Sequence, residues 1–204
     1  MLREAVLQPF RQVATAADVL AKVAEDRGGL TRTTYDTVRS AGYQAVVLAD
    51  LARLLDEDIA VLARRADGAL QPGTDPSERA RVLANAFTGT IRATATLVDT
   101  CHTLLGVAQV LLVIRRTRSR LELMSAVETL RAAASTAHLT VLANLPRVTD
   151  SELYDELAVG LGSLDVTLAL ANWLTSAMRS DTALGGPMPA QRVSADAARL
   201  HGVS

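Results

Sequence analysis

Two residues near the middle of the chain have types and a spacing suited to proton transfer. Asp99 and His102 are three positions apart, so on a helix their side chains share one face and can meet. A carboxylate beside an imidazole raises the basicity of the imidazole and fixes its tautomer. The pair is the best acid–base candidate in the sequence, although the same spacing also fits an ordinary ion pair on a helix surface.

Asp58 is a second candidate acid or base. It precedes Ile59, which belongs to a stripe of apolar residues, so its carboxylate is expected at the edge of a buried face. There it can exchange protons with a substrate at the rim of a pocket. It can equally be a solvated acid beside Asp56 and Glu57, and the residues alone leave both interpretations open.

Three further polar residues are candidates for substrate binding. Glu128 and His138 fall on one line of a predicted helix, and this line is either a polar seam facing a cavity or the solvated face. Asn144 carries an amide that both donates and accepts hydrogen bonds, so it can orient a ring carbonyl. It can also cap the end of a helix just before Pro146.

Metal ligands and redox cysteines are scarce in this sequence. The three histidines, His102, His138 and His201, are scattered, and the single cysteine, Cys101, lies in an apolar stripe, where cysteine usually acts as a small hydrophobic residue. We therefore expect no metal and no cofactor. One cysteine forms no intrachain disulfide, which favours a cytoplasmic location.

The elements that must position these residues are long helices. Hydrophobic residues make up 49% of the chain but aromatic residues only 3%, so the core must be aliphatic, and Ala and Leu favour helix. Apolar residues recur at spacings of three and four, and Gly and Pro cut the chain into a few pieces. The expected helices cover about 2–27, 33–70, 76–116, 119–144 and 149–181.

Local signals mark several helix ends. Gly28-Gly29 ends the first helix, and Pro9 either kinks that helix or marks a later start. Asp75 before Pro76 is typical of a helix start, as is the run 149–152, while Pro146 ends the fourth helix. Helices joined by short loops run antiparallel. The sequence therefore predicts an all-α antiparallel bundle of about five helices over residues 1–183, with a loosely held tail over 184–204.

Charge and hydropathy disfavour two classes of partner. The formal net charge is −1, so no global field attracts nucleic acid or anionic lipid. The longest apolar run, residues 104–114, is about half of what a membrane-spanning helix needs. We expect a small-molecule substrate, and neither a nucleic acid nor a membrane partner.

Two stretches carry a resemblance to a known family. They are LLDEDIAVLARRADGALQPGTDPSERA, residues 54–80, and TVLANLPRVTDSELYDEL, residues 140–157. Their order and spacing resemble the cyclodeaminase/cyclohydrolase family of helical folate-processing proteins, over about residues 50–157. The resemblance implies a helical bundle that forms a homodimer, gives the carboxylate of Asp58 a role in a site, and makes Asn144 the residue that fits the family's Asn-rich helix end.

The chain also departs from the family's pattern. It lacks the Pro- and Gly-rich loop that usually opens the family's sequence, and Met124 stands where an Asp is usual. Thr140 and Leu142 stand where another Asn and an Arg are expected. A Gly-rich loop lets backbone N–H groups approach a ligand closely, so its absence argues against folate binding in the family's usual way.

These observations lead to one functional hypothesis and two alternatives. The hypothesis is a cofactor-independent cyclase or lyase in a specialised biosynthetic pathway, acting on a non-folate substrate through Asp58, Asp99 and His102. The first alternative is a C–N ring hydrolase of the family, a methenyltetrahydrofolate cyclohydrolase or formiminotetrahydrofolate cyclodeaminase. The second is a helical binding protein without catalysis, which predicts no pocket with convergent polar groups.

Overall fold

The computed structural model describes residues 2–25, 30–114 and 119–179, and within them the chain is helical without any strand. The main helices are α1 Leu2–Glu25, α2 Arg32–Ala69, α3 Pro76–Ile114, α4 Arg120–Asn144 and α5 Ser151–Arg179, with a short 3₁₀ turn, η1 Leu145–Arg147. This confirms the predicted all-α bundle. The predicted stop at Gly28-Gly29 and the tail 184–204 lie outside the described residues.

Helix α3 lies at the centre of the bundle. It contacts α1, α2, α4 and α5, and α1 also packs against α2 and α4. Its buried residues follow the three-and-four spacing from Ile91 to Leu112, as expected for a helix covered on several sides. A smaller cluster closes one end of the bundle and consists of Ile91, Val141, Leu153 and Leu157.

The core is aliphatic, as the composition predicts, and the helices therefore approach one another closely. On α2 the residues turned inward include Ala45, Ala49 and Ala52, each fully buried. At Gly42 a Cβ atom would lie 2.7 Å from Cβ of Ala24 on α1, a distance that real atoms avoid. Small residues at this contact let α1 and α2 pack with little space between their backbones.

The predicted helix starts at Asp75 and in the run 149–152 are confirmed. The Asp75 carboxylate accepts hydrogen bonds from the backbone N–H groups of Ser77 and Glu78, at 2.9 and 3.1 Å. The hydrogen bond from the Ser77 hydroxyl is the largest of the causes that lower the pKa of Asp75. Asp150 caps α5 in the same way, accepting from the N–H groups of Glu152 and Leu153.

Pro9 lies inside α1, which begins at Leu2. The later start that this proline allowed for is therefore wrong. A proline inside a helix removes one backbone hydrogen bond, and its ring crowds the carbonyl four residues back. Pro9 and the neighbouring Phe10 are buried. Burial of this part of the helix offsets the missing hydrogen bond.

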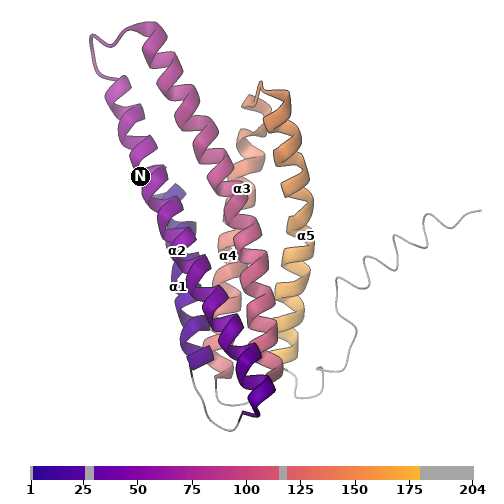
Figure 1. Cartoon of the computed structure of the whole chain (residues 1–204). Helices are drawn as coiled ribbons and strands as arrows, with labels where there is room; N and C mark the ends of the chain where they lie inside the picture. The colour runs from indigo at the N-terminus through magenta and orange to yellow at the C-terminus, as the bar shows by residue number, and fades with distance from the viewer. Residues whose placement is uncertain (1, 26–29, 115–118, 180–204) are drawn as a thin grey trace, which may run out of the picture.

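The α2–α3 hairpin extends beyond the other helices (Figure 1). At 1.5 Å per residue, the 39 residues of α3 span about 58 Å, whereas the 25 residues of α4 span about 38 Å. Arg79 closes the turn at the tip, because its guanidinium donates to the carbonyl oxygens of Ala69 and Thr74. The tip of the hairpin is thus a two-helix layer, without α4 behind it.

Of the helices that the structure describes, two, α3 and α5, are long and apolar enough in composition to span a membrane. Core helices of soluble proteins share this composition. In α3, 56% of the most apolar stretch is buried within the protein. Packing at the centre of the bundle is enough to account for the hydropathy of α3.

The close contact at Gly42 generates a stability prediction. Replacing Gly42 with Ala forces α1 and α2 apart, and such overpacking costs about 1–3 kcal/mol, against about 1 kcal/mol gained in helix propensity. Gly106 on α3 is the matched control, because a Cβ there meets nothing within 4 Å. Chemical denaturation should show Gly42→Ala less stable than wild type and Gly106→Ala more stable by about 1 kcal/mol. Equal stabilisation by both substitutions would contradict the close contact.

Candidate functional site

Several hollows open along the face that α2 and α3 share, and two of them bear on the predicted site. The first, which we call the Asp58 hollow, has a volume of about 460 Å³ and is lined by Leu55, Asp58, Ile59, Val61, Leu62, Arg65, Gly89, Arg92, Ala93 and Thr96. The second, the His102 hollow, has a volume of about 710 Å³ and is lined by Asp36, Thr37, Ser40, Ala41, Gln44, His102, Thr103, Gly106, Val107 and Val110. Both hold side chains that the sequence singled out.

The two hollows are too far apart to act on one small reacting group. Gln44 lines the His102 hollow and lies 14 residues before Asp58 on the same helix, which corresponds to about 21 Å along the axis. Proton transfer requires heavy atoms within about 3.2 Å or one bridging water. Asp58 and His102 of one chain therefore do not form a single catalytic cluster.

Asp99 and His102 share a face of α3, as predicted, but they do not pair. Each side chain bonds instead to α5: Nδ1 of His102 lies 3.2 Å from Oγ1 of Thr167, and Oγ of Ser163 donates to Oδ1 of Asp99 at 3.4 Å. Asp99 is exposed and His102 is half-buried. The expected carboxylate–imidazole pair is replaced by two neighbouring contacts between α3 and α5.

Asp58 is exposed and forms no hydrogen bond or ion pair within the described residues. Two arginines share its hollow. Arg92 reaches Glu156 on α5 at 3.4 Å, whereas Arg65 has no partner in the part of the chain that the structure describes. Arg65 and Leu62 also line a further hollow of about 480 Å³ toward the tip of the hairpin. The carboxylate of Asp58 and the guanidinium of Arg65, which has no partner among the described residues, thus line the same hollow.

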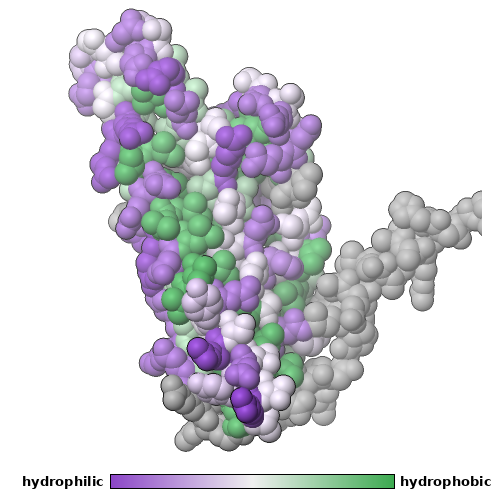
Figure 2. Space-filling model, viewed as in Figure 1, coloured by the Kyte–Doolittle hydropathy of each residue, from purple (hydrophilic) through white to green (hydrophobic). Residues whose placement is uncertain are grey.

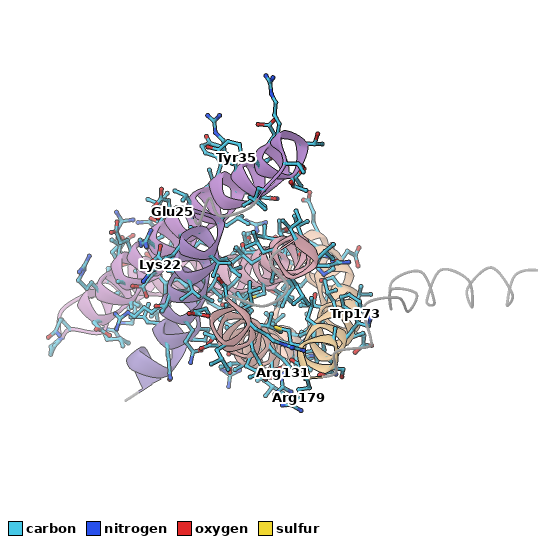
Figure 3. The ribbon with its side chains drawn as sticks, turned by 90° about the horizontal axis from the view of Figure 1, so that it is seen from below. Lys22, Glu25, Tyr35, Arg131, Trp173 and Arg179 are labelled. Atoms are coloured by element: carbon cyan, nitrogen blue, oxygen red, sulfur yellow. The ribbon has the colours of Figure 1, made fainter. Side chains whose placement is uncertain are left out.

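Glu128 on α4 is held by two partners. Its carboxylate accepts from Arg131 at 2.8 Å and from the hydroxyl of Thr175 on α5 at 3.0 Å. Burial raises the pKa of Glu128, but these hydrogen bonds and the charges of Arg131 and Arg179 outweigh burial, so the pKa lies below its ordinary value. Figure 3 shows Arg131 and Arg179 together on one side of the bundle. Glu128 is an ionised link between α4 and α5.

His138 and Asn144 lie on α4 as well, and neither lines the Asp58 or the His102 hollow. Nδ1 of His138 is buried without a hydrogen-bond partner in the described structure. The amide of Asn144 donates to the carbonyl of Thr140 at 2.7 Å, at the last residue of the helix. The structure therefore does not bring the three residues expected to bind substrate together with the three expected to be catalytic.

Cys101 on α3 is fully buried in the hydrophobic core. Burial raises the pKa of its thiol far above the usual range, so the thiolate is not formed near neutral pH. Among the described residues, no group of three or more His, Cys, Asp or Glu side chains is placed to hold a metal ion.

A comparison with family models matches residues 31–161 to the formiminotransferase-cyclodeaminase model. The chain belongs to this family. The match covers well over half of the 204 residues and runs from the start of α2 into the first turns of α5. Both hollows lie within it, whereas α1 and Thr167 lie outside. No curated protein matches the chain.

Sequence reasoning missed three residues of these sites. Arg65 could have been found, because Asp58, Leu62 and Arg65 follow the same four-and-three spacing as the apolar stripe of α2. Arg92 lies across the hollow on α3, and matching it to Asp58 requires the register of the two helices. Thr167 is 65 positions from His102, and no local pattern connects them.

The burial of Cys101 predicts inertness toward thiol reagents. Native protein should not react measurably with Ellman's reagent near neutral pH, because the thiol is buried and protonated. Protein in guanidinium chloride should react with one equivalent, since the chain has a single cysteine. Rapid labelling of the folded protein would contradict the placement of Cys101 in the core.

Proposed function

We propose that this chain is an enzyme that transfers protons on a small-molecule substrate held in the His102 hollow. The reaction opens or closes a ring, or eliminates water or ammonia, with His102 as the group that carries the proton. Membership of a family named for a cyclodeaminase supports an acid–base reaction. The imidazole suits this role, since it is the one side chain whose ordinary pKa lies between pH 5 and 8.

The observation that carries the proposal is the anchoring of His102. Its Nδ1 is bound to Thr167 on α5, a residue that is fully buried. Its other ring nitrogen, Nε2, has no partner among the described residues and is not one of their buried unpaired atoms, so solvent reaches it. General acid–base catalysis needs a group that is held in position and can still reach the substrate. Nδ1 of His102 supplies the first condition and Nε2 the second.

The charge of the hollow supports a non-folate substrate. Of the residues that line it, Asp36 has the only permanent charge, and none is Lys or Arg. Folates carry carboxylates, which a site with one negative and no positive charge disfavours. The missing Gly-rich loop supports the same conclusion.

The family's own activity is the second candidate, and one observation favours it. The Asp58 hollow contains Arg65, which has no partner among the described residues, and Arg92, and these cations suit the carboxylates of a folate. In that case Asp58, rather than His102, is the acid or base, and the enzyme is a methenyltetrahydrofolate cyclohydrolase or a formiminotetrahydrofolate cyclodeaminase.

Turnover by point variants distinguishes these functions. The wild-type protein is incubated with a small-molecule cell extract and, separately, with methenyltetrahydrofolate. Mass spectrometry then detects compounds that gain or lose water or ammonia. We expect conversion in the extract, a loss of at least about 100-fold in His102→Ala, and no change in Glu57→Gln, whose side chain lies outside both hollows.

Other outcomes support the rivals. Conversion of the folate that is lost in Asp58→Asn and Arg65→Ala but kept in His102→Ala favours the family's own activity. No conversion of any compound by the wild type favours a binding protein without catalysis.

We also propose that the chain is a homodimer that buries the outer face of α2. Large apolar side chains are exposed there: Tyr43, Val46, Val47 and Leu54. Figure 2 shows hydrophobic residues gathered over this part of the molecule. Such residues at helical spacing suit a contact with a second helix.

Light scattering tests the dimer. Wild-type protein should have twice the mass of one chain, and Val47→Glu should shift the mass toward the monomer because it buries a charge in the contact. Leu139→Glu, at an exposed apolar position on α4, should stay dimeric. A monomeric wild-type protein would contradict the proposal.

A further inference from the structure

The contact between His102 and Thr167 involves a third atom. The hydroxyl of Thr167 lies 2.9 Å from the carbonyl oxygen of Ser163, one turn earlier on α5, and 3.2 Å from Nδ1 of His102 on α3. Threonine commonly donates to the carbonyl four residues back in a helix. Thr167 is fully buried, so water does not supply an alternative partner for its hydroxyl.

The number of protons in this cluster selects one tautomer of His102. A threonine hydroxyl has a single hydrogen, and the carbonyl of Ser163 has none to offer. If Thr167 donates to Ser163 and Nδ1–H donates to Thr167, both contacts are hydrogen bonds. If Thr167 donates to Nδ1 instead, two oxygen atoms without a hydrogen between them are left 2.9 Å apart in a buried place, which is unfavourable.

We propose that Thr167 is a positioning residue that holds neutral His102 with its hydrogen on Nδ1, so that Nε2 is a hydrogen-bond acceptor facing the His102 hollow. A ligand in this hollow then presents an N–H or O–H group to His102. The hollow has the carboxylate of Asp36 and no Lys or Arg, so the ligand is neutral or cationic. The tautomer and the ligand class do not depend on the proposed function. The statement that His102 acts first as a base rests on it.

Nuclear magnetic resonance of the histidine ring nitrogens tests the tautomer directly, without a substrate. At about pH 8.5 an ordinary imidazole is neutral, and the ¹⁵N shifts show which nitrogen carries the hydrogen. We expect the Nδ1–H form for His102 in the wild type, although a histidine in water prefers Nε2–H. A wild-type His102 in the Nε2–H form would overturn the inference, whatever the enzyme's activity.

Two variants separate positioning from packing. Thr167→Val keeps the shape but removes the acceptor, so Nδ1–H would face a methyl group, and His102 should shift to the Nε2–H form, whose donor reaches solvent. Thr167→Ser keeps the hydroxyl and should keep the Nδ1–H form. His138 on α4 is the internal control, and its ring shifts should stay unchanged. An Nδ1–H form in Thr167→Val would overturn the role of Thr167.

A pair of isosteric probes tests the ligand class. Acetamidinium is a cation with N–H donors, and acetate is an anion of the same shape with acceptors only. We expect acetamidinium at millimolar concentrations to shift the ring signals of His102, with little effect of acetate. Gly106→Leu should abolish the shift, because Gly106 lines the hollow and has open space beside it. Equal or stronger shifts with acetate would overturn the assignment.

These experiments distinguish failure of the proposed function from failure of the role given to Thr167. An Nδ1–H tautomer and selective binding of acetamidinium, combined with unimpaired turnover in His102→Ala, would leave the binding site standing and remove the proposed function. The reverse result, loss of turnover with an Nε2–H tautomer, would remove the role of Thr167 and leave the proposed function standing.

Discussion

The structure depends on how closely its helices approach one another. Among the described residues Phe10 is the only fully buried aromatic side chain, so the packing density of the protein core must come mostly from short distances between helices. Gly42 against Ala24 is the clearest example. At Gly89 a Cβ would lie 2.6 Å from a methyl group of Leu62, but that methyl is the end of a flexible side chain that can move aside. The register of α2 on α1 is therefore the one that small residues fix.

The register of α2 against α3 determines which polar side chains of these two helices lie close together. Because α2 and α3 run antiparallel over most of their length, the first turns of α2 face the last turns of α3, and Asp36 shares a hollow with Gly106. The later part of α2 faces the middle of α3, where Asp58 shares a hollow with Arg92. One helix pair thus carries two separate polar environments, one with arginines and one without.

The fold could be predicted from the sequence to within a few residues, because its signals are local. Apolar spacing defines the helices, and Asp75, Asp150 and Pro146 mark ends that the structure confirms. The site could be predicted only in part. That Asp99 and His102 share a face follows from their spacing, but whether they pair is decided by Ser163 and Thr167 on another helix. A pattern within one segment does not show that a residue distant in sequence bonds the same side chain instead. For the same reason the role of Asn144 stayed open, and its amide in fact bonds its own helix.

The unequal lengths of the helices have a mechanical consequence. Beyond the ends of α4 and α5, the α2–α3 hairpin is supported from one side only, so the free energy that opens its tip is smaller than the free energy that unfolds the bundle. The Asp58 hollow adjoins this tip through Leu62 and Arg65, although its Arg92 is held by Glu156 on α5. A ligand bound on the Leu62 and Arg65 side would spend part of its binding free energy on ordering a loosely supported arm, whereas a ligand beside His102 binds where α5 packs against α3.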